Sequence, residues 1–349
     1  MKKIIEKVLD NQRISRTEGL RLLQEGDFYQ LGMLADAVRK RKHPEPLVTY
    51  VNDRNINYTD ICISACKFCA FYKAPEDKTG YLLSFEELGQ KIEETKQLGG
   101  TQILLQGGLH PDKPLEYYEG MLQFMKGYDI HIHGFSPPEI CHFVKLSGLT
   151  IREVLVRLQN AGLDSMPGGG AEILTDRVRE ETAPRKCSAE AWLRVMEEAH
   201  ILGMRTTATM MFGHIETLEE RVEHLDCLRS LQDRTQGFTA FIPWPFQPDN
   251  TVYKDLPKTT AFEYLKMLAF SRIYMDNIDN IQASWVTQGP KIAQTSLFFG
   301  ANDFGSTMIE ENVVAAAGVS FRLSEKEICT LVRDAGFEPR QRRMDYSLV

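Results

Sequence analysis

The chain has 349 residues, enough for two ordinary domains or one large α/β barrel, and its 26% charged and 43% hydrophobic residues indicate a folded globular protein. Its 41 basic and 48 acidic residues give a net charge of −7, which disfavours nucleic acid and anionic membranes as partners. No apolar run reaches the roughly 18 residues of a membrane-spanning helix, and Glu6 interrupts the first residues before a signal-peptide core can form. We therefore expect a cytoplasmic protein.

Residues 1–45 are predicted to form an N-terminal helical extension. Ser15 and Glu18 match a capping box, and Pro44 ends a later helical pattern. Residues 321–349 are predicted to form a C-terminal helix and tail, in which Ser324 begins the helix.

Residues 46–320 alternate between short apolar runs and segments of helical period, which is typical of α/β folds with a parallel sheet. Strands are predicted near residues 47–58, 102–105, 130–133, 162–165, 206–211, 238–242, 281–285 and 297–299. About eight strands predict a (β/α) TIM-type barrel, and a six-stranded open barrel with a C-terminal extension stays possible. Unusual residues gather in the loops after the strands, where such barrels keep their active sites.

Three of the seven cysteines lie close together in the sequence CISACKFC, as Cys62, Cys66 and Cys69. A structural zinc site normally needs a fourth ligand, and a redox CxxC pair would leave Cys62 without a role. Three thiolates on one loop can instead hold a [4Fe–4S] cluster and leave its fourth iron open to a small molecule. An open iron indicates catalysis, and a structural zinc or cluster site is the alternative.

The CxxxCxxC spacing, with the aromatic Phe68 before the last cysteine, resembles the radical S-adenosylmethionine (SAM) superfamily. The resemblance implies a partial or complete (β/α) barrel with the cluster loop after its first strand. It also implies that SAM binds the open iron and is split to a 5′-deoxyadenosyl radical. Splitting a sulfonium needs a low-potential electron donor, such as a flavodoxin or ferredoxin.

Further motifs resemble a subgroup that contains the menaquinone enzymes of the futalosine pathway and the deazaflavin (FO) synthases. They are GGGAEI (168–173), MMFGHIET (210–217), FIPWPFQPDNT (241–251), QASWVTQG (282–289) and FGANDFGSTMIEENV (299–313). Within the subgroup they most resemble the cyclases that act on dehypoxanthine futalosine. That resemblance implies abstraction of the ribose C4′ hydrogen and C–C closure onto the aryl ring, in menaquinone biosynthesis. The alternative is an aminofutalosine synthase or FO synthase-like enzyme, which joins two substrates.

The resemblance also implies a set of cofactor-binding residues. Gly107 and Gly108 would receive the methionyl amine of SAM, and Glu172 would bond its ribose hydroxyls or amine. For Glu172, the alternative is a carboxylate that complements a helix N-terminus. The predicted cofactor-binding residues are Phe68, Tyr72, Gly107, Gly108, Ser136 and Glu172.

Loops that look specific to the subgroup supply the predicted substrate contacts, with packing at the barrel mouth as the alternative. These residues are Trp244, Gln247, Trp285, Gln288, Asn302 and Asp303. Arg54, Arg157 and Arg205 are candidates for binding the substrate carboxylate. The base that takes the final proton is unassigned. Its candidates are His110, His133 and His214, with His131 nearby, and a structural histidine is the alternative for each.

Overall fold

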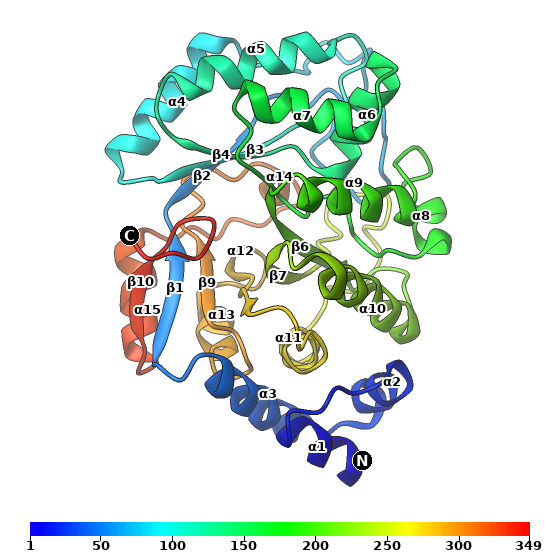
Figure 1. The fold of residues 1–349 in the computed structure, drawn as a ribbon, viewed down its shortest axis with the longest axis vertical. Coiled ribbons are helices and arrows are strands. Elements are labelled where there is room, and N and C mark those ends of the chain that lie inside the picture. Colours follow the sequence, from blue (N-terminus) through cyan, green and yellow to red (C-terminus); the bar gives the residue numbers. More distant parts are fainter.

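The computed structural model describes residues 1–349, and its ten strands form two parallel sheets (Figure 1). The strands are β1 (Leu47–Val51), β2 (Asp53–Asn57), β3 (Gln102–Gln106), β4 (His131–Gly134), β5 (Ser165–Met166), β6 (Arg205–Phe212), β7 (Phe238–Pro245), β8 (Asn280–Ile281), β9 (Asp303–Ser306) and β10 (Glu338–Gln341). The larger sheet has seven strands in chain order, from β2 to β8. All of its neighbouring strands run parallel.

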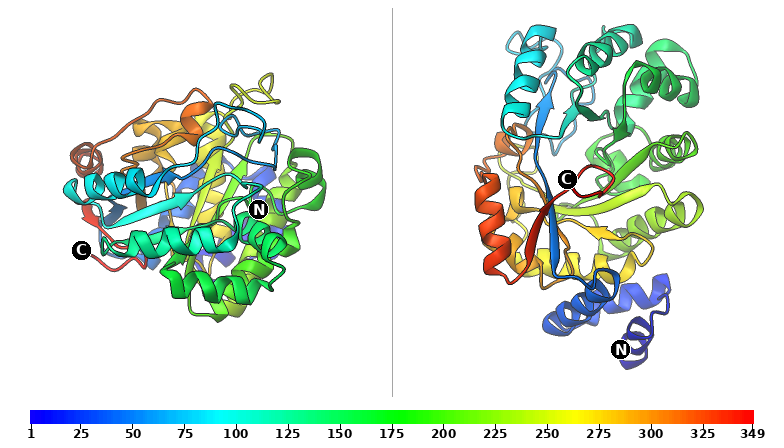
Figure 2. Two further views of the ribbon diagram at one scale, coloured as in Figure 1. Left: turned by 90° about the horizontal axis from the view of Figure 1, so that it is seen from above. Right: turned by 60° about the vertical axis from the view of Figure 1, so that its left-hand side comes forward.

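Helices surround this sheet on its outer face, and the sheet curls around a central space (Figures 1 and 2). The helices are α1 (Lys2–Leu9), α2 (Arg16–Glu25), α3 (Phe28–Lys42), α4 (Phe85–Gln97), α5 (Leu115–Lys126), α6 (Pro137–Ser147), α7 (Ile151–Ala161), α8 (Asp176–Thr182), α9 (Ala189–Ile201), α10 (Leu218–Thr235), α11 (Ala261–Tyr274), α12 (Trp285–Gln288), α13 (Pro290–Ser296), α14 (Val313–Ala316) and α15 (Glu325–Asp334). The architecture is the α/β barrel of parallel strands and outer helices that the sequence predicts.

A second sheet, in the order β10-β1-β9, fills the gap between the edges of the curled sheet. Strand β1 is continuous with β2 except for Asn52, so one stretch of chain contributes to both sheets. On the other side, the Asn302 amide donates to the Ile281 carbonyl at 3.1 Å, and the Ala283 amide to the Asp303 carbonyl at 2.9 Å. These bonds connect β8 to β9 and complete the barrel wall.

Three strand predictions need correction. Of residues 162–165, only Ser165 lies in a strand, because Gly162 caps the C-terminus of α7 and β5 begins at Ser165. Residues 297–299 form a turn after α13, where the amides of Leu297, Phe298 and Phe299 each bond the carbonyl three residues earlier. Their apolar side chains continue the packing of that helix, whereas the strand lies later, at β9. Residues 281–285 are also mostly not strand, because β8 ends at Ile281 and α12 begins at Trp285.

Helix caps follow the sequence closely. Capping boxes form at Ser15, Ser84, Ser136, Thr217 and Ser324, each with a glutamate three residues later. They fix where each loop ends and each helix begins, which matters most at Ser136, because that loop leaves the cavity-facing strand β4.

Strand residues alternate between the cavity and the helices. On β3, Ile103 and Leu105 are buried in the hydrophobic core, whereas Gln102, Leu104 and Gln106 line the central cavity. The same alternation places Asp53 and Asn55 of β2, and Thr207 and Thr209 of β6, on the cavity wall. Polar side chains within apolar strands therefore face inward.

The N-terminal helices pack outside the barrel against α10 and α11. Leu31, Leu34 and Val38 of α3 belong to the same buried cluster as Phe270 and Tyr274 of α11. The helical extension therefore shares the hydrophobic core of the barrel. The domain boundaries at residues 45 and 320 stay predictions, and the C-terminal segment adds the strand β10 to the predicted helix.

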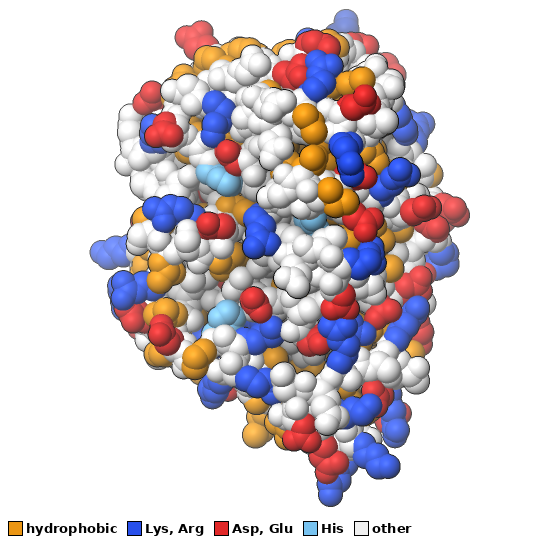
Figure 3. Space-filling view, in the orientation of Figure 1, with side chains coloured by type: hydrophobic (Ala, Val, Ile, Leu, Met, Phe, Trp, Pro, Cys, Tyr) orange, Lys and Arg blue, Asp and Glu red, His pale blue; other side chains and the backbone are white.

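Acidic and basic side chains are interspersed over the face shown in Figure 3, in keeping with the modest net charge. None of the helices combines the length and the apolar character that crossing a membrane requires.

Candidate active site

The loop after β2 carries the three clustered cysteines, all as free thiols. The Cys62 sulfur accepts backbone hydrogen bonds from Ser64, at 3.4 Å, and from Leu109. The Cys69 sulfur accepts them from the amides of Phe71 and Tyr72. Burial raises the pKa of both thiols, and these N–H donors oppose that effect. Backbone donors aimed at sulfur are the environment that cluster-bound thiolates need.

No three His, Cys, Asp or Glu side chains converge around one point, as a mononuclear metal site requires. Three thiolates on one loop, without a fourth protein ligand, are the donor set of a four-iron cluster with one open iron, so Cys62, Cys66 and Cys69 fit such a cluster.

A buried ion pair lies beside this loop. The Lys186 ammonium bonds the Glu172 carboxylate at 2.7 Å and sits 4.9 Å from the centre of the Phe68 ring. Burial alone would raise the pKa of Glu172, but the nearby Lys186 lowers it below its ordinary value. Burial likewise opposes the charge of Lys186, and the Cys66 thiol and Glu172 raise its pKa despite that. The pair is therefore charged next to the cluster cysteines.

Glu172 also has an unusual backbone conformation, with a φ of +42°. Left-handed conformations are uncommon outside glycine and concentrate at functional sites. Glu172 thus lies where the predicted cofactor contact would be, although its carboxylate is bonded to Lys186.

The glycine pair after β3 contacts the cysteine loop directly. A Cβ at Gly107 would overlap the Tyr58 ring, and one at Gly108 would overlap the Ile61 carbonyl. Only glycine therefore allows the two loops to approach this closely.

Glu139 holds Gly107 and Tyr58 in place through hydrogen bonds. Its carboxylate accepts hydrogen bonds from the Tyr58 hydroxyl at 2.7 Å, the Gly107 amide at 3.1 Å, and the amide and hydroxyl of Ser136. The predicted cofactor ligand Ser136 therefore has its hydroxyl bound to Glu139. The sequence analysis did not single out Glu139, because nothing in its local sequence indicates that its carboxylate reaches Gly107.

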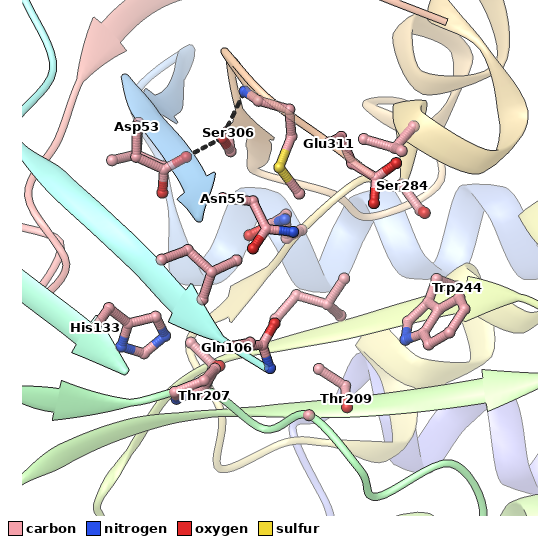
Figure 4. A pocket seen from close by; sticks show the side chains of 18 of the residues that line it. Asp53, Asn55, Gln106, His133, Thr207, Thr209, Trp244, Ser284, Ser306 and Glu311 are labelled. Atoms are coloured by element: carbon pink, nitrogen blue, oxygen red, sulfur yellow. Dashed lines mark hydrogen bonds between the residues drawn. The ribbon is translucent and has the colours of Figure 1, made fainter. Parts of the chain in front are cut away.

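The barrel encloses a cavity of about 270 Å³ that extends through its interior. Figure 4 shows side chains from several strands pointing into it, including Asn55 from β2, Gln106 from β3 and Trp244 from β7. Gln106 directly precedes the glycine pair, so this wall of the cavity adjoins the loop that packs against the cysteine loop. Val51, Leu104, Ile242 and Met344 are among its apolar walls. A space of this kind can hold a small organic substrate away from bulk water.

Two of the six predicted substrate contacts line this cavity, namely Trp244 and Trp285. Trp285 is nearly fully buried and donates its indole N–H to the Ser306 carbonyl at 2.9 Å. Gln247 and Gln288 lie outside the lining, where their amides bond the carbonyls of Pro245 and Thr287.

Asn302 and Asp303 also lie outside the cavity lining. The Asn302 side chain accepts from Arg272 at 2.5 Å and donates to Asn280 at 2.8 Å. Asp303 is completely buried and forms a two-point ion pair with Arg342. Both side chains are occupied by protein partners.

Among the candidate bases, only His133 lines the cavity. Burial lowers its pKa to about 3, so it is neutral and a weak base at pH 7. His131 and His133 both contact the Ser165 hydroxyl, at 2.7 and 2.8 Å.

The other two candidate histidines have local partners. The His110 ring accepts from the Asp112 amide at 3.2 Å, and the His214 ring lies 3.2 Å from Glu216. Burial lowers the pKa of both rings.

None of the three arginines predicted for carboxylate binding reaches the cavity. Arg54 pairs with Glu94, Arg157 with Glu116 and Glu119, and Arg205 bonds a backbone carbonyl. The cavity's arginine is Arg342, from the C-terminal segment. The sequence analysis missed Arg342, because nothing in the local sequence of the C-terminal segment indicates that it enters the barrel.

The polar strand residues Asp53, Asn55, Gln102, Thr207 and Thr209 were also missed. They had a signal in the sequence, namely polar side chains at every second position of apolar strands, which indicates a polar face turned away from the helices.

Two family models match the chain and together cover most of it. Residues 56–228 match the radical SAM superfamily, and residues 235–349 match the CofH/MqnC C-terminal region. Among solved structures, the hydrogenase maturase HydG from Carboxydothermus hydrogenoformans covers 99% of this chain and 80% of its own, with a TM-score of 0.78 and 20% identity. Methylornithine synthase (PylB) covers 96% and 97%, with a TM-score of 0.75 and 16% identity. At these identities the structures support the fold.

Curated relatives are similar over nearly the full length. Cyclic dehypoxanthine futalosine synthase of Halalkalibacterium halodurans is 45% identical, covering 99% of this chain and 94% of its own. A 5-amino-6-(D-ribitylamino)uracil–L-tyrosine 4-hydroxyphenyl transferase of Archaeoglobus fulgidus is 43% identical, covering 92% and 94%. Aminodeoxyfutalosine synthase of Thermus thermophilus is 42% identical, covering 97% and 93%. The chain therefore belongs to the radical SAM superfamily of enzymes, whose cofactors are a [4Fe–4S] cluster and S-adenosylmethionine.

Proposed function

We propose that this enzyme converts dehypoxanthine futalosine to cyclic dehypoxanthine futalosine, a step of menaquinone biosynthesis. The observation that carries the proposal is 45% identity, over nearly the whole chain, to cyclic dehypoxanthine futalosine synthases from Halalkalibacterium halodurans and Streptomyces coelicolor. The transferase and the aminodeoxyfutalosine synthase follow at 43% and 42%. Because these sequence identities differ by only a few per cent, the proposal also depends on whether the cavity suits an intramolecular closure.

An intramolecular closure needs one substrate, with its ribose and its aryl ring held in one enclosed space. Trp244 and the aliphatic walls suit the aryl ring, and Asn55, Gln106 and Thr209 offer amide and hydroxyl groups to the ribose. The cavity lies next to the glycine pair and the cysteine loop, which brings the substrate close to the cofactors. These features support a single-substrate reaction inside the barrel.

Cys62, Cys66 and Cys69 would hold the cluster, which together with SAM would supply a 5′-deoxyadenosyl radical to take the ribose C4′ hydrogen. In the overall balance, one electron would enter with the cleavage of SAM, and one electron and a proton would leave the substrate once C4′ has bonded the aryl ring. The substrate and SAM thus become the cyclic product, methionine, 5′-deoxyadenosine and a proton. The initial electron comes from a low-potential donor, for which we propose a flavodoxin or ferredoxin.

The final proton needs an acceptor on the cavity wall. Burial raises the pKa of Asp53 and of Glu311, which makes each a stronger base than an exposed carboxylate. His133, with a pKa of about 3, is less suited to this role. We therefore propose that one of these two carboxylates accepts the proton.

The test is an anaerobic reaction of the reconstituted enzyme with SAM, dithionite and dehypoxanthine futalosine, followed by mass spectrometry. We expect 5′-deoxyadenosine to rise with substrate, together with a product two hydrogens lighter than the substrate. Cys66→Ala is the control, and it should form neither product because the cluster loses a ligand.

Formation of 5′-deoxyadenosine without any change in dehypoxanthine futalosine would refute the proposed substrate and favour a two-substrate relative. Full activity in Cys66→Ala would refute the role of the cysteine loop.

A further inference from the structure

The C-terminal segment after β10 closes the cavity at the end of the barrel where the strands begin, and we call this end the floor of the cavity. Its side chains alternate: Arg342 and Met344 are buried and line the cavity, whereas Arg343 and Asp345 are exposed. The Arg342 amide bonds the Tyr50 carbonyl at 2.9 Å, which attaches the segment to β1. The last residues of the chain therefore supply part of the cavity wall.

Arg342 is held rigidly in this floor. Its Nε and Nη2 donate to the two oxygens of Asp303, at 2.5 and 3.0 Å, and its guanidinium carbon lies 4.0 Å from the centre of the Tyr346 ring. Its Nη1 donates to the Arg343 carbonyl at 3.2 Å. A guanidinium has five N–H donors, so two are not engaged by these partners.

Arg342 is also the only lysine or arginine among the 26 residues that line the cavity. The neighbouring acid, Asp53, is occupied by the Ser306 hydroxyl and by the Gln102 amide at 2.7 Å. The third ionisable side chain at this end, His133, is neutral. Arg342, whose charge is shared with Asp303, is therefore the one cationic side chain on the cavity wall that an anionic group can meet.

We infer that Arg342 binds the carboxylate of the substrate's carboxyphenyl ring and so determines the orientation of the substrate. The inference rests on the proposed function, because it assumes that the substrate carries this carboxylate. An ionised carboxylate in an enclosed apolar cavity needs a cation, and a guanidinium offers two parallel donors of matching geometry. With the carboxylate at the floor, the rest of the substrate extends toward the glycine pair and the cysteine loop.

The test compares the binding of dehypoxanthine futalosine and of its aryl carboxamide analogue to the reconstituted enzyme with SAM, by anaerobic calorimetry. We expect the wild type to bind the carboxylate at least 10-fold more tightly than the carboxamide. Arg342→Met should bind the two compounds within about twofold of each other, because the group that distinguishes them is gone. Arg343→Met is the matched control, and this exposed neighbour should keep the wild-type preference.

Arg342→Met leaves Asp303 buried without its partner, which can prevent folding, so a second variant that keeps the charge is also tested. Arg342→Lys keeps a positive charge beside Asp303 but loses the planar pair of donors, and we expect it to fold and to show a preference reduced at least threefold.

A purely structural role would lower the melting temperature of these variants and leave the preference for the carboxylate unchanged, which would overturn the inference. A wild type that binds both compounds equally would also overturn it, while the proposed function would stand. A wild type that binds neither compound would overturn both.

Discussion

Single buried side chains set the electrostatic conditions of this site. Lys186 and Glu172 form a charged pair at 2.7 Å next to the Cys66 thiol, and Phe68 covers the ammonium. A buried pair is costly to break, because removing one partner leaves the other charge without compensation. This pair therefore keeps one cation and one anion fixed beside the cysteine loop before any cofactor binds.

Buried histidines make the stability of the protein depend on pH. Burial lowers the pKa of His200 from its ordinary 6.5 to about 4, and its ring contacts the hydroxyls of Thr206 and Thr235 at 2.7 Å. Because the folded pKa is the lower one, the unfolded chain binds more protons below pH 6.5. Stability that is present above pH 6.5 is lost as the pH falls toward 4, at up to about 1.4 kcal/mol per pH unit.

We expect His200→Gln to remove this contribution. The slope of the unfolding free energy against pH, measured by urea denaturation of the cluster-free protein between pH 6 and 4.5, should decrease by roughly 1 kcal/mol per pH unit. An unchanged slope would show that His200 does not titrate differently in the folded protein.

At the scale of the element, the N-terminus of α6 connects a helix cap to the cofactor loop. Its capping glutamate, Glu139, is buried and bonds Tyr58 and Gly107 in addition to Ser136. The capping box at Ser84, by contrast, is exposed and serves only α4. The same sequence pattern thus has different consequences in two places.

We predict that Glu139→Gln destabilises the protein by about 2 to 3 kcal/mol, because an amide has one oxygen to accept from four donors and adds a donor of its own. It should also weaken SAM binding, since Gly107 loses its anchor. Glu87→Gln, in the exposed box, should cost about 0.5 to 1 kcal/mol and leave SAM binding unchanged. Urea denaturation and calorimetry with SAM measure both effects, and equal behaviour of the two variants would contradict the assignment.

For the whole molecule, the terminal segments are parts of the barrel structure. The N-terminal helices pack into the core shared with α11, and Arg39 of α3 donates to the Ala301 carbonyl at 2.9 Å. The C-terminal strand β10 pairs with β1. Both chain ends therefore stabilise the barrel, the N-terminal helices through α11 and the C-terminal strand through β1.

Deletion of residues 1–45 should expose the apolar surface of α11 and prevent cooperative folding of the remainder. We expect residues 46–349 to aggregate or to lose a single thermal transition, as measured by size-exclusion chromatography and calorimetry. A monodisperse fragment that melts at the wild-type temperature would show instead that the extension is an independent unit.

Local sequence patterns determined much of this protein. Cap residues located helix starts at Ser15 and Ser324, because a capping box depends only on neighbours in the chain. Strand and helix periodicity indicated the barrel, and the spacing of the three cysteines indicated the family. The strand near residues 297–299 was wrong, because an apolar run fits a buried helix end as well as a strand.

Only the tertiary structure decided which side chains share the cavity. Arg342 meets Asp303 across 39 residues of sequence, and Glu139 meets Tyr58 across 81. Asn302 and Asp303 lie in a motif that looks like a substrate loop, yet Arg272 and Arg342 occupy their side chains. Contacts of this kind depend on how the strands close into a barrel, and that closure leaves no local signal in the chain.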